Sequence, residues 1–203
     1  MGVLILRRMA SHAATLAVLQ ALKARLERSM AALMGSPVTV NVMGSSTLQS
    51  APAPATNALG VYLHRISIDP VGRNRYLPPA EGQRRPRPEL PVNLHLLLIA
   101  WTVSADIEVA YLTAAMQAIG STLVLGAGDI GAADPGWGAD ETVQVLPEDM
   151  GTEDLMRLWD SLPGDYRLSA PYLVKTLRLL PHEVQPDVPL VRTLVFPAGV
   201  GPE

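Results

Sequence analysis

The segment that most constrains the fold is residues 91–101, Pro-Val-Asn-Leu-His-Leu-Leu-Leu-Ile-Ala-Trp. A β-strand with its period of two would place on one face Val92, Leu94, Leu96, Leu98 and Ala100, and on the other Asn93, His95, Leu97, Ile99 and Trp101. Both faces are mainly apolar, which is typical of a strand that is covered on both sides. We therefore predict that this strand lies at the centre of a sheet.

An amphipathic helix is predicted directly after this strand. Ser104 and Asp106 offer N-cap oxygens, and Gly120 ends the segment. Apolar residues recur at steps of three and four between them: Val109, Leu112, Met116 and Ile119. This spacing predicts a helix that packs back on its own strand.

The rest of the chain adds two helices and several strands around this centre. The helices are predicted at 11–33 and at 151–162. The apolar face of the first consists of Leu16, Leu19, Leu22, Leu26, Met30 and Leu33. The strands are predicted at 37–42, 58–68, 121–125, 142–146 and 173–180, with a last short strand or tail at 190–196. In the strand at 173–180, Lys175 and Arg178 do not share one face, which predicts a bulge or an edge position.

These elements predict an α/β (α+β) fold of one domain. The chain has 203 residues, of which 48% are apolar and 17% charged, enough for one buried core. The central sheet is expected to be mixed or antiparallel, flanked by helices and long Pro-rich loops. We expect an N-terminal arm at 1–10, the α/β domain at 11–182 and a C-terminal tail at 183–203.

Two long segments without periodicity are predicted to be loops. Residues 44–57 are rich in Ser, Thr, Ala and Pro, and residues 69–90 are rich in Pro and Arg. A connection of about twenty residues inside a compact domain is uncommon, so 69–90 is either a solvated loop or an arm that binds a partner. In the second alternative its prolines keep it extended and its arginines pair with carboxylates of another chain. The candidate interface residues are then Arg73, Arg75, Tyr76, Arg84, Arg85 and Arg87.

Composition argues against several classes of function. The absence of cysteine excludes disulfides, zinc–thiolate sites and thiol nucleophiles. A net charge of -3 gives no field that gathers nucleic acid, and Tyr76 is the sole aromatic residue of the 69–90 arm that can stack on bases. The longest apolar run, 96–101, is far shorter than the about 20 residues that cross a membrane. We expect neither a nucleic-acid partner nor direct membrane insertion, and near the N-terminus the apolar run precedes Arg7 and Arg8, the reverse of a signal peptide.

One segment matches a nucleotide-binding pattern. Residues 126–131, Gly-Ala-Gly-Asp-Ile-Gly, fit G-x-G-x-x-G letter for letter. The third glycine of that pattern opens a helix that holds the pyrophosphate, but here Pro135, Gly136 and Gly138 follow within seven residues. A glycine loop is therefore the preferred interpretation, and a small nucleotide-binding enzyme that uses Gly126–Gly131 is the alternative from another class.

The remaining polar residues predict no catalytic or metal site. The four histidines, His12, His64, His95 and His182, lie on different predicted elements without metal-ligand spacing, and His64 and His95 are placed to face each other across paired strands. The carboxylates of 129–154, including Glu148, lack the order of a calcium loop and are expected to form a solvated acidic surface. No serine stands in G-x-S-x-G. We expect no cofactor, no metal and no enzymatic activity.

The order of these elements resembles a known family. Three segments of the first half are similar to the tail-terminator or cap proteins of extracellular contractile injection systems. These systems are phage-tail-like particles of the antifeeding-prophage and Photorhabdus virulence cassette type. The segments are the helix at 11–33, the strand at 58–68 with Asn74 and Leu77-Pro-Pro79, and residues 90–101 with their helix. Three segments of the second half also resemble that family: Glu148-Asp149-Met150, 155–159 and 166–172. The resemblance covers about residues 11–182.

The resemblance implies a structural cap. Such a protein forms a ring, expected to be a homohexamer, on the last layer of inner tube and sheath, and ends their polymerisation. It implies sheath and inner-tube proteins as partners, and assembly in the bacterial cytoplasm within a particle that is released or stays intracellular. A phage-tail completion protein or another oligomeric adaptor with the same fold is the nearest alternative.

Overall fold

The computed structural model describes residues 12–49, 57–73, 89–131, 133–134, 136–162 and 164–179. Its helices are α1 (Ala14–Met34), α2 (Ser45–Gln49), α3 (Pro70–Arg73), α4 (Ala105–Ile119), α5 (Ala127–Ile130) and α6 (Thr152–Asp160). Its strands are β1 (Val40–Met43), β2 (Ala58–Ile68), β3 (Leu90–Trp101), β4 (Leu123–Leu125), β5 (Val143–Pro147) and β6 (Ser169–Leu179). The predicted strand at 190–196 lies outside the described residues.

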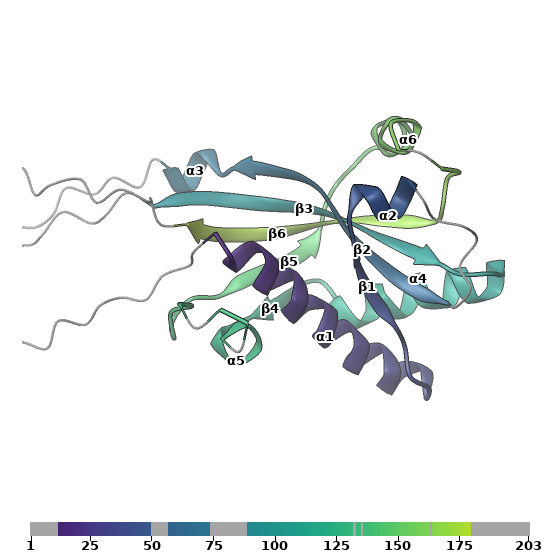
Figure 1. The fold of residues 1–203 in the computed structure, drawn as a ribbon, viewed down its shortest axis with the longest axis horizontal. Coiled ribbons are helices and arrows are strands. Elements are labelled where there is room, and N and C mark those ends of the chain that lie inside the picture. Colours follow the sequence, from purple (N-terminus) through teal and green to yellow (C-terminus); the bar gives the residue numbers. More distant parts are fainter. Residues whose placement is uncertain are drawn as a thin grey trace, which may run out of the picture.

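The strands form one mixed sheet in the order β1-β2-β3-β6-β5-β4 (Figure 1). β1 pairs with β2 in parallel, and all other pairs are antiparallel. β3 lies inside the sheet between the two other long strands, which confirms the prediction drawn from its two apolar faces. The predicted α/β fold with a mixed central sheet is therefore confirmed.

β6 is longer and more central than the sequence predicted. It begins at Ser169 and lies between β3 and β5, so the predicted edge position is wrong. The predicted bulge is confirmed by the pairing of β6 with β3. Val92 pairs with Leu177 and Leu94 pairs with Val174, so β6 has one more residue than β3 between these two pairs. This irregularity explains why charged side chains of one strand leave it in different directions.

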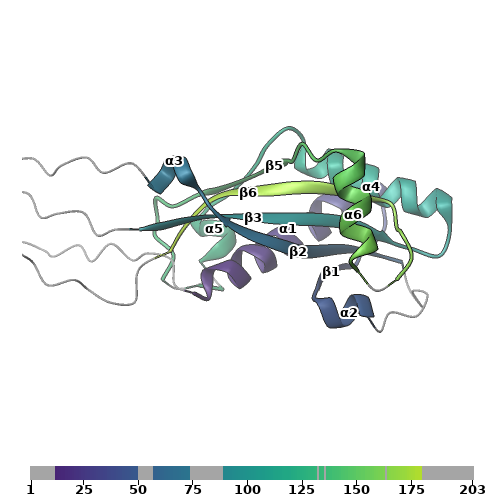
Figure 2. The same ribbon diagram turned by 90° about the horizontal axis from the view of Figure 1, so that it is seen from above.

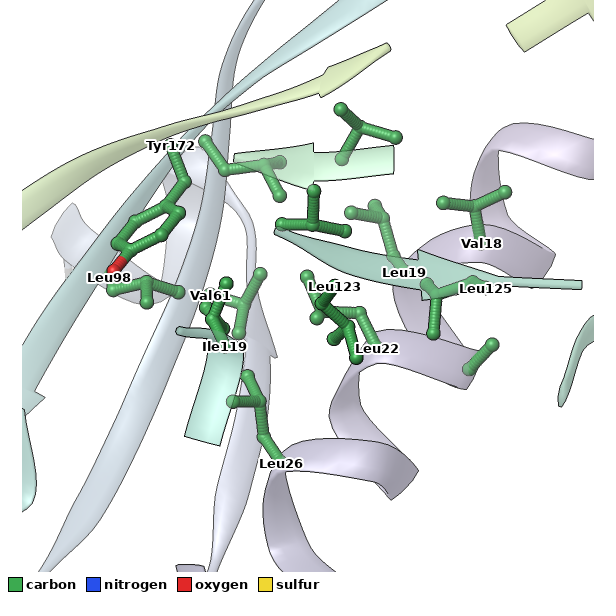
Figure 3. Packing of buried hydrophobic residues seen from close by; sticks show 14 of the residues in the cluster. Val18, Leu19, Leu22, Leu26, Val61, Leu98, Ile119, Leu123, Leu125 and Tyr172 are labelled. Atoms are coloured by element: carbon green, nitrogen blue, oxygen red, sulfur yellow. The ribbon is translucent and has the colours of Figure 1, made fainter. Parts of the chain in front are cut away.

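One face of the sheet carries the main core, below the sheet in Figure 1, where α1, α4 and α5 lie. Figure 3 shows Leu22 and Leu26 of α1 facing the sheet residues Val61 and Leu98. The predicted apolar helix faces are partly wrong, since Leu16, Leu33, Val109 and Met116 are exposed. The buried positions of these helices include several alanines instead. They are Ala14, Ala17 and Ala21 of α1 and Ala114 and Ala115 of α4. α1 and α4 contact each other, and alanines let two helices approach closely where larger side chains would keep them apart.

The opposite face is covered at one end by α2 and α6 (Figure 2). Trp159 of α6 is 5% exposed, packs with Leu97 and Ile99 of β3, and donates from its indole N–H to Ser169 Oγ at 3.0 Å. A Cβ on Gly60 of β2 would lie 2.5 Å from the Met43 sulfur, so glycine leaves room for that side chain. The other half of this face is polar.

Short helices occur in three segments that were predicted to be loops. α2 lies within 44–57, α3 within 69–90 and α5 within the glycine segment 126–131. Helices of four or five residues are too short to show an apolar repeat, which is why the sequence pattern did not predict them.

Candidate protein interface

The arm that carries the predicted interface residues begins and ends at one end of the sheet. Asp69 N–H donates to Pro91 O at 2.9 Å, so the stem of this connection is closed by β2 and β3. The Asp69 carboxylate accepts from Val71 N–H at 3.0 Å and from the Thr176 hydroxyl at 3.3 Å. The base of the arm is thereby fixed to β6 as well as to β3.

The structure places the backbone of one of the six candidate residues. Arg73 is the last residue of α3, directly beyond β2. The other five candidates lie outside the described residues: Arg75, Tyr76, Arg84, Arg85 and Arg87. Their role as an interface stays a prediction.

Exposed apolar side chains gather at the base of this arm. They are Ile66 and Ile68 of β2, which are 55% and 49% exposed, Val71 of α3, which is 71% exposed, and Leu90 of β3, which is 42% exposed. Large aliphatic side chains at this exposure, clustered at one end of a sheet, are typical of a surface that contacts another protein. The sequence pattern alone could not identify them, because alternation assigns Ile66 and Ile68 to a face without showing whether that face is covered.

The outer edge of β2 is unpaired along its second half in the described structure. β1 pairs with Leu59–Tyr62, and no other described strand pairs with the outer side of Leu63–Ile68 (Figure 1). The backbone N–H of Asp69 donates to β3, and in an antiparallel ladder every second residue directs its backbone N–H and C=O groups to the same neighbour. The backbone groups of Arg65 and Ser67 therefore also face β3. Ile66 and Ile68 therefore present their backbone N–H and C=O groups to this outer edge, which we call the open edge.

A network of polar side chains lies on the same face of the sheet as Leu97 and Ile99. His95 of β3 is 7% exposed, and its Nε2 lies 2.7 Å from Ser67 Oγ. Its Nδ1 lies 2.6 Å from Glu148 Oε1, just after β5. A carboxylate accepts hydrogen bonds only, so Nδ1–H donates to Glu148. In the neutral imidazole Nε2 then accepts from the Ser67 hydroxyl. We call Ser67, His95 and Glu148 the His95 network.

The His95 network has the connectivity of a hydrolase triad but not its setting. Ser67 lies in the middle of β2, and its backbone N–H faces β3 opposite Asn93. That N–H is therefore not directed to a position where an oxyanion could develop. The network links β2, β3 and the end of β5, and we interpret it as structural.

Two predictions about this region have different outcomes. His64 and His95 do face each other across paired strands, with ring centroids 6.0 Å apart, as the sequence predicted. The assignment of Glu148 to a solvated acidic surface is wrong, because its side chain is 18% exposed and bonds to His95. A polar His95 on a strand with two apolar faces was the sequence signal that a buried partner was needed.

Burial lowers the pKa of His64. The nearby Glu148 carboxylate acts in the opposite direction, while His95 and Arg65 add to the lowering. Because burial dominates, the folded state binds a proton at His64 less readily than the unfolded chain, whose histidine has a pKa of about 6.5.

We expect the folded state to lose stability as the pH falls below about 6.5, since the unfolded chain then binds a proton that folded His64 resists. The loss should level off below the folded pKa, and above pH 6.5 the contribution should be absent. Urea denaturation between pH 5 and 8 would measure it. A His64→Gln variant should show a shallower slope over this range, whereas equal slopes in both proteins would contradict the assignment to His64.

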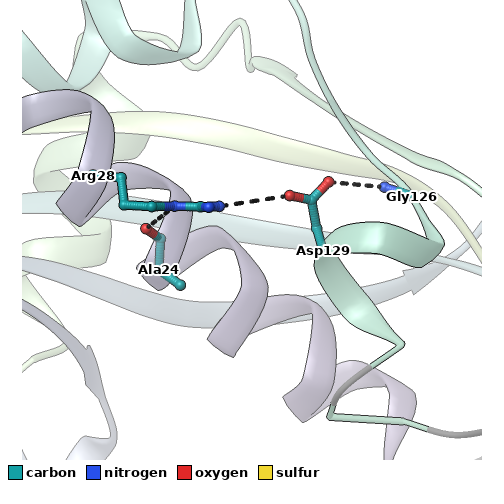
Figure 4. Close-up of polar contacts among 4 residues, drawn as sticks. All are labelled: Ala24, Arg28, Gly126 and Asp129. Atoms are coloured by element: carbon teal, nitrogen blue, oxygen red, sulfur yellow. Dashed lines mark hydrogen bonds and ion pairs between the residues drawn. The ribbon is translucent and has the colours of Figure 1, made fainter.

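The glycine segment does not form a nucleotide site. Its helix, α5, has a single turn, and Asp129 Oδ2 accepts from Gly126 N–H at 3.3 Å (Figure 4). The other oxygen of this carboxylate lies 3.8 Å from Arg28 Nη2 of α1. The Gly126 N–H, a donor of the kind that a phosphate would need, is thus bonded to a carboxylate of the same segment, and the alternative of a nucleotide-binding enzyme is not supported.

The described residues contain neither a metal-binding group nor a membrane-spanning helix. Within them, no group of three His, Asp or Glu side chains could hold a metal ion. Among the helices that the structure describes, none has the length and apolar character needed to cross a bilayer.

Comparisons with known proteins indicate where this fold occurs. The chain shares 16% identity and a TM-score of 0.51 with the sheath/tube terminator of PVC, an extracellular contractile injection system, over 95% of this chain and 66% of that one. The anti-feeding prophage cap shares 17% identity with a TM-score of 0.47, over 91% of this chain and 60% of that one. The chain thus spans 66% and 60% of the length of these two proteins, less than two thirds of either. No curated protein sequence matches it.

The strongest comparison is at the level of the family. The model of the Pvc16 N-terminal domain matches residues 17–193, which includes every strand of the described sheet. The match extends over most of the chain and agrees with the range of the resemblance read from the sequence. This chain belongs to the Pvc16 N-terminal domain family.

Proposed function

We propose that this chain serves as a structural cap, or tail terminator, of a contractile injection system. The observation that carries the proposal is the family match over residues 17–193. The fold that it shares with a sheath/tube terminator supports the same role. In this role the chain binds the last layer of inner tube and sheath, ends their polymerisation and performs no catalysis.

The proposed cap is a ring, expected to be a homohexamer. A closed ring needs two different complementary patches on each subunit. The described surface offers a candidate for one of them, since the exposed cluster of Ile66, Ile68, Val71 and Leu90 lies at one end of the sheet. The arm with Arg73, Arg75, Tyr76, Arg84, Arg85 and Arg87 leaves from the same end and is proposed to contact sheath or tube carboxylates. Assembly is proposed to take place in the bacterial cytoplasm.

Particle length tests this function. The chain would be co-expressed with the sheath and inner-tube proteins encoded in its own genome, and particle lengths measured by electron microscopy. We expect a narrow length distribution with the chain and a broad one with longer particles without it. If the distribution is the same with and without the chain, the cap role is wrong.

Three arginines of the arm provide a sharper test. Replacing Arg84, Arg85 and Arg87 by Gln should weaken binding to sheath and tube about tenfold or more, because each loses a charge-assisted pair at the interface. The matched control replaces three exposed arginines elsewhere, Arg25, Arg28 and Arg157, by Gln. Equal binding by both variants, measured by co-sedimentation, would show that net charge and not the arm matters.

A further inference from the structure

The last three residues of the open edge, Ile66 to Ile68, lack the usual protection of an exposed strand. Natural edge strands are protected by charges, prolines or bulges that discourage pairing with other chains. Beyond the bulge between Leu63 and Arg65, this edge ends in Ile66-Ser-Ile68, with the two isoleucines about half exposed. Their backbone groups and their aliphatic side chains both lack a partner strand in the described structure, so the edge is suited to receive an added strand.

The sequence contains a segment with the character of such a strand. Residues 190–196, Leu-Val-Arg-Thr-Leu-Val-Phe, are rich in β-branched and aromatic residues and lie between Pro189 and Pro197. Seven residues match the six of the open edge, Leu63–Ile68. The segment lies outside the described residues, so its position must be inferred from where the described chain ends.

β6 ends close enough to the open edge for this segment to reach it. Leu179 pairs with Leu90 and Ile68 pairs with Val92, so β6 and β2 end at the same end of β3. A strand added outside β2 would lie three strand spacings from β6, about 14 Å. The ten residues 180–189 span up to about 35 Å when extended, more than twice that distance. The linker is therefore long enough to extend beyond the edge of its own sheet.

We propose that residues 190–196 of one copy add as an antiparallel strand to the open edge of β2 in the next copy. This inference rests on the proposed ring. The open edge and the 190–196 segment are different patches of one chain, so the contact is head-to-tail and repeats from copy to copy, as a closed ring requires. The backbone of Ile66 and Ile68 supplies the hydrogen bonds, and the added strand covers the two isoleucine side chains.

Disulfide trapping tests this pairing directly, because the natural chain has no cysteine. Ile66→Cys would be combined in turn with a single cysteine at each position from 190 to 196, since facing residues of antiparallel strands lie within disulfide distance. After mild oxidation of the protein at high concentration and of co-expressed particles, we expect one pair to give a ladder of linked oligomers on non-reducing gels. A link within one chain, or no link in any pair, would overturn the proposal.

The matched control uses the other edge of the sheet. Val124 of β4 is 51% exposed, so Val124→Cys with Thr193→Cys has the same number of thiols at similar exposure. This control should not form the ladder. If it links as efficiently as the Ile66 pairs, the links reflect random collision and the proposal fails.

A second measurement does not depend on cysteine variants. In the natural chain at high concentration, the amides of Ile66 and Ile68 should exchange with deuterium slowly, and Thr193→Pro should accelerate them about tenfold or more, because proline removes a donor and blocks the added strand. Val200→Pro, outside the segment, is the control. Fast exchange of both amides in the natural chain would overturn the proposal. Particle-length control that persists with Thr193→Pro would leave the cap role intact and separate the two proposals.

Discussion

Replacement of Leu98 by alanine is expected to lower the free energy of unfolding by about 2–5 kcal/mol. Leu98 lies on β3 and is 0% exposed in the core between the sheet and the helices α1 and α4. Figure 3 shows it beside Tyr172 of β6, so the shortened side chain leaves a cavity between the central strands and their helices. Urea denaturation followed by circular dichroism would measure the loss.

Leu16→Ala is the matched control for this prediction. Leu16 lies on α1 but is 57% exposed, and alanine is a strong helix former. The control should change the free energy of unfolding by less than about 0.5 kcal/mol. A loss below about 1 kcal/mol for Leu98→Ala would mean that the sheet face is less tightly packed than the structure shows.

Replacement of Glu148 by alanine is expected to cost about 1–3 kcal/mol of unfolding free energy. The substitution removes the acceptor 2.6 Å from His95 Nδ1 and leaves a buried donor without a partner. The 18% exposure of the carboxylate places the expected loss at the lower end for a buried polar contact, because water can enter in its place. The loss would be measured by urea denaturation at pH 7.

Two further variants separate the hydrogen bond from general effects of charge. Glu148→Gln keeps an acceptor for His95 and should lose less stability than Glu148→Ala. Glu153→Gln removes an equal charge from the exposed ion pair with Arg157, where the two side chains are 78% and 72% exposed, and should change little. Equal losses for Glu148→Ala and Glu148→Gln would contradict a specific bond to His95.

The long elements of the fold were predictable because their patterns repeat several times. The strand predicted at 58–68 agrees with β2 residue for residue, and the apolar alternation of 91–101 placed β3 correctly inside the sheet. The faces of α1 and α4 were less predictable. Leu16 and Val109 fit an apolar stripe by spacing, but the positions that these helices bury in the core include smaller residues such as Ala17 and Ala115.

The candidate site was less predictable than the fold, since it depends on which strands are neighbours. Glu148 and His95 are 53 residues apart in the sequence and meet because β6 brings β5 close to β3. The open edge depends on the short length of β1, which pairs with four residues of β2 and no more. Periodicity along one segment carries no information about either relation.

The closed stem between Asp69 and Pro91 has a consequence for how this protein can diversify. Because the two ends of the arm are held together by a backbone bond of 2.9 Å, its length can change without moving a strand. Each doubling of a flexible loop costs only about 0.6 kcal/mol in closure entropy. Insertions at this position are therefore compatible with one unchanged sheet. This end of the domain is therefore a suitable position for a genetically inserted tag.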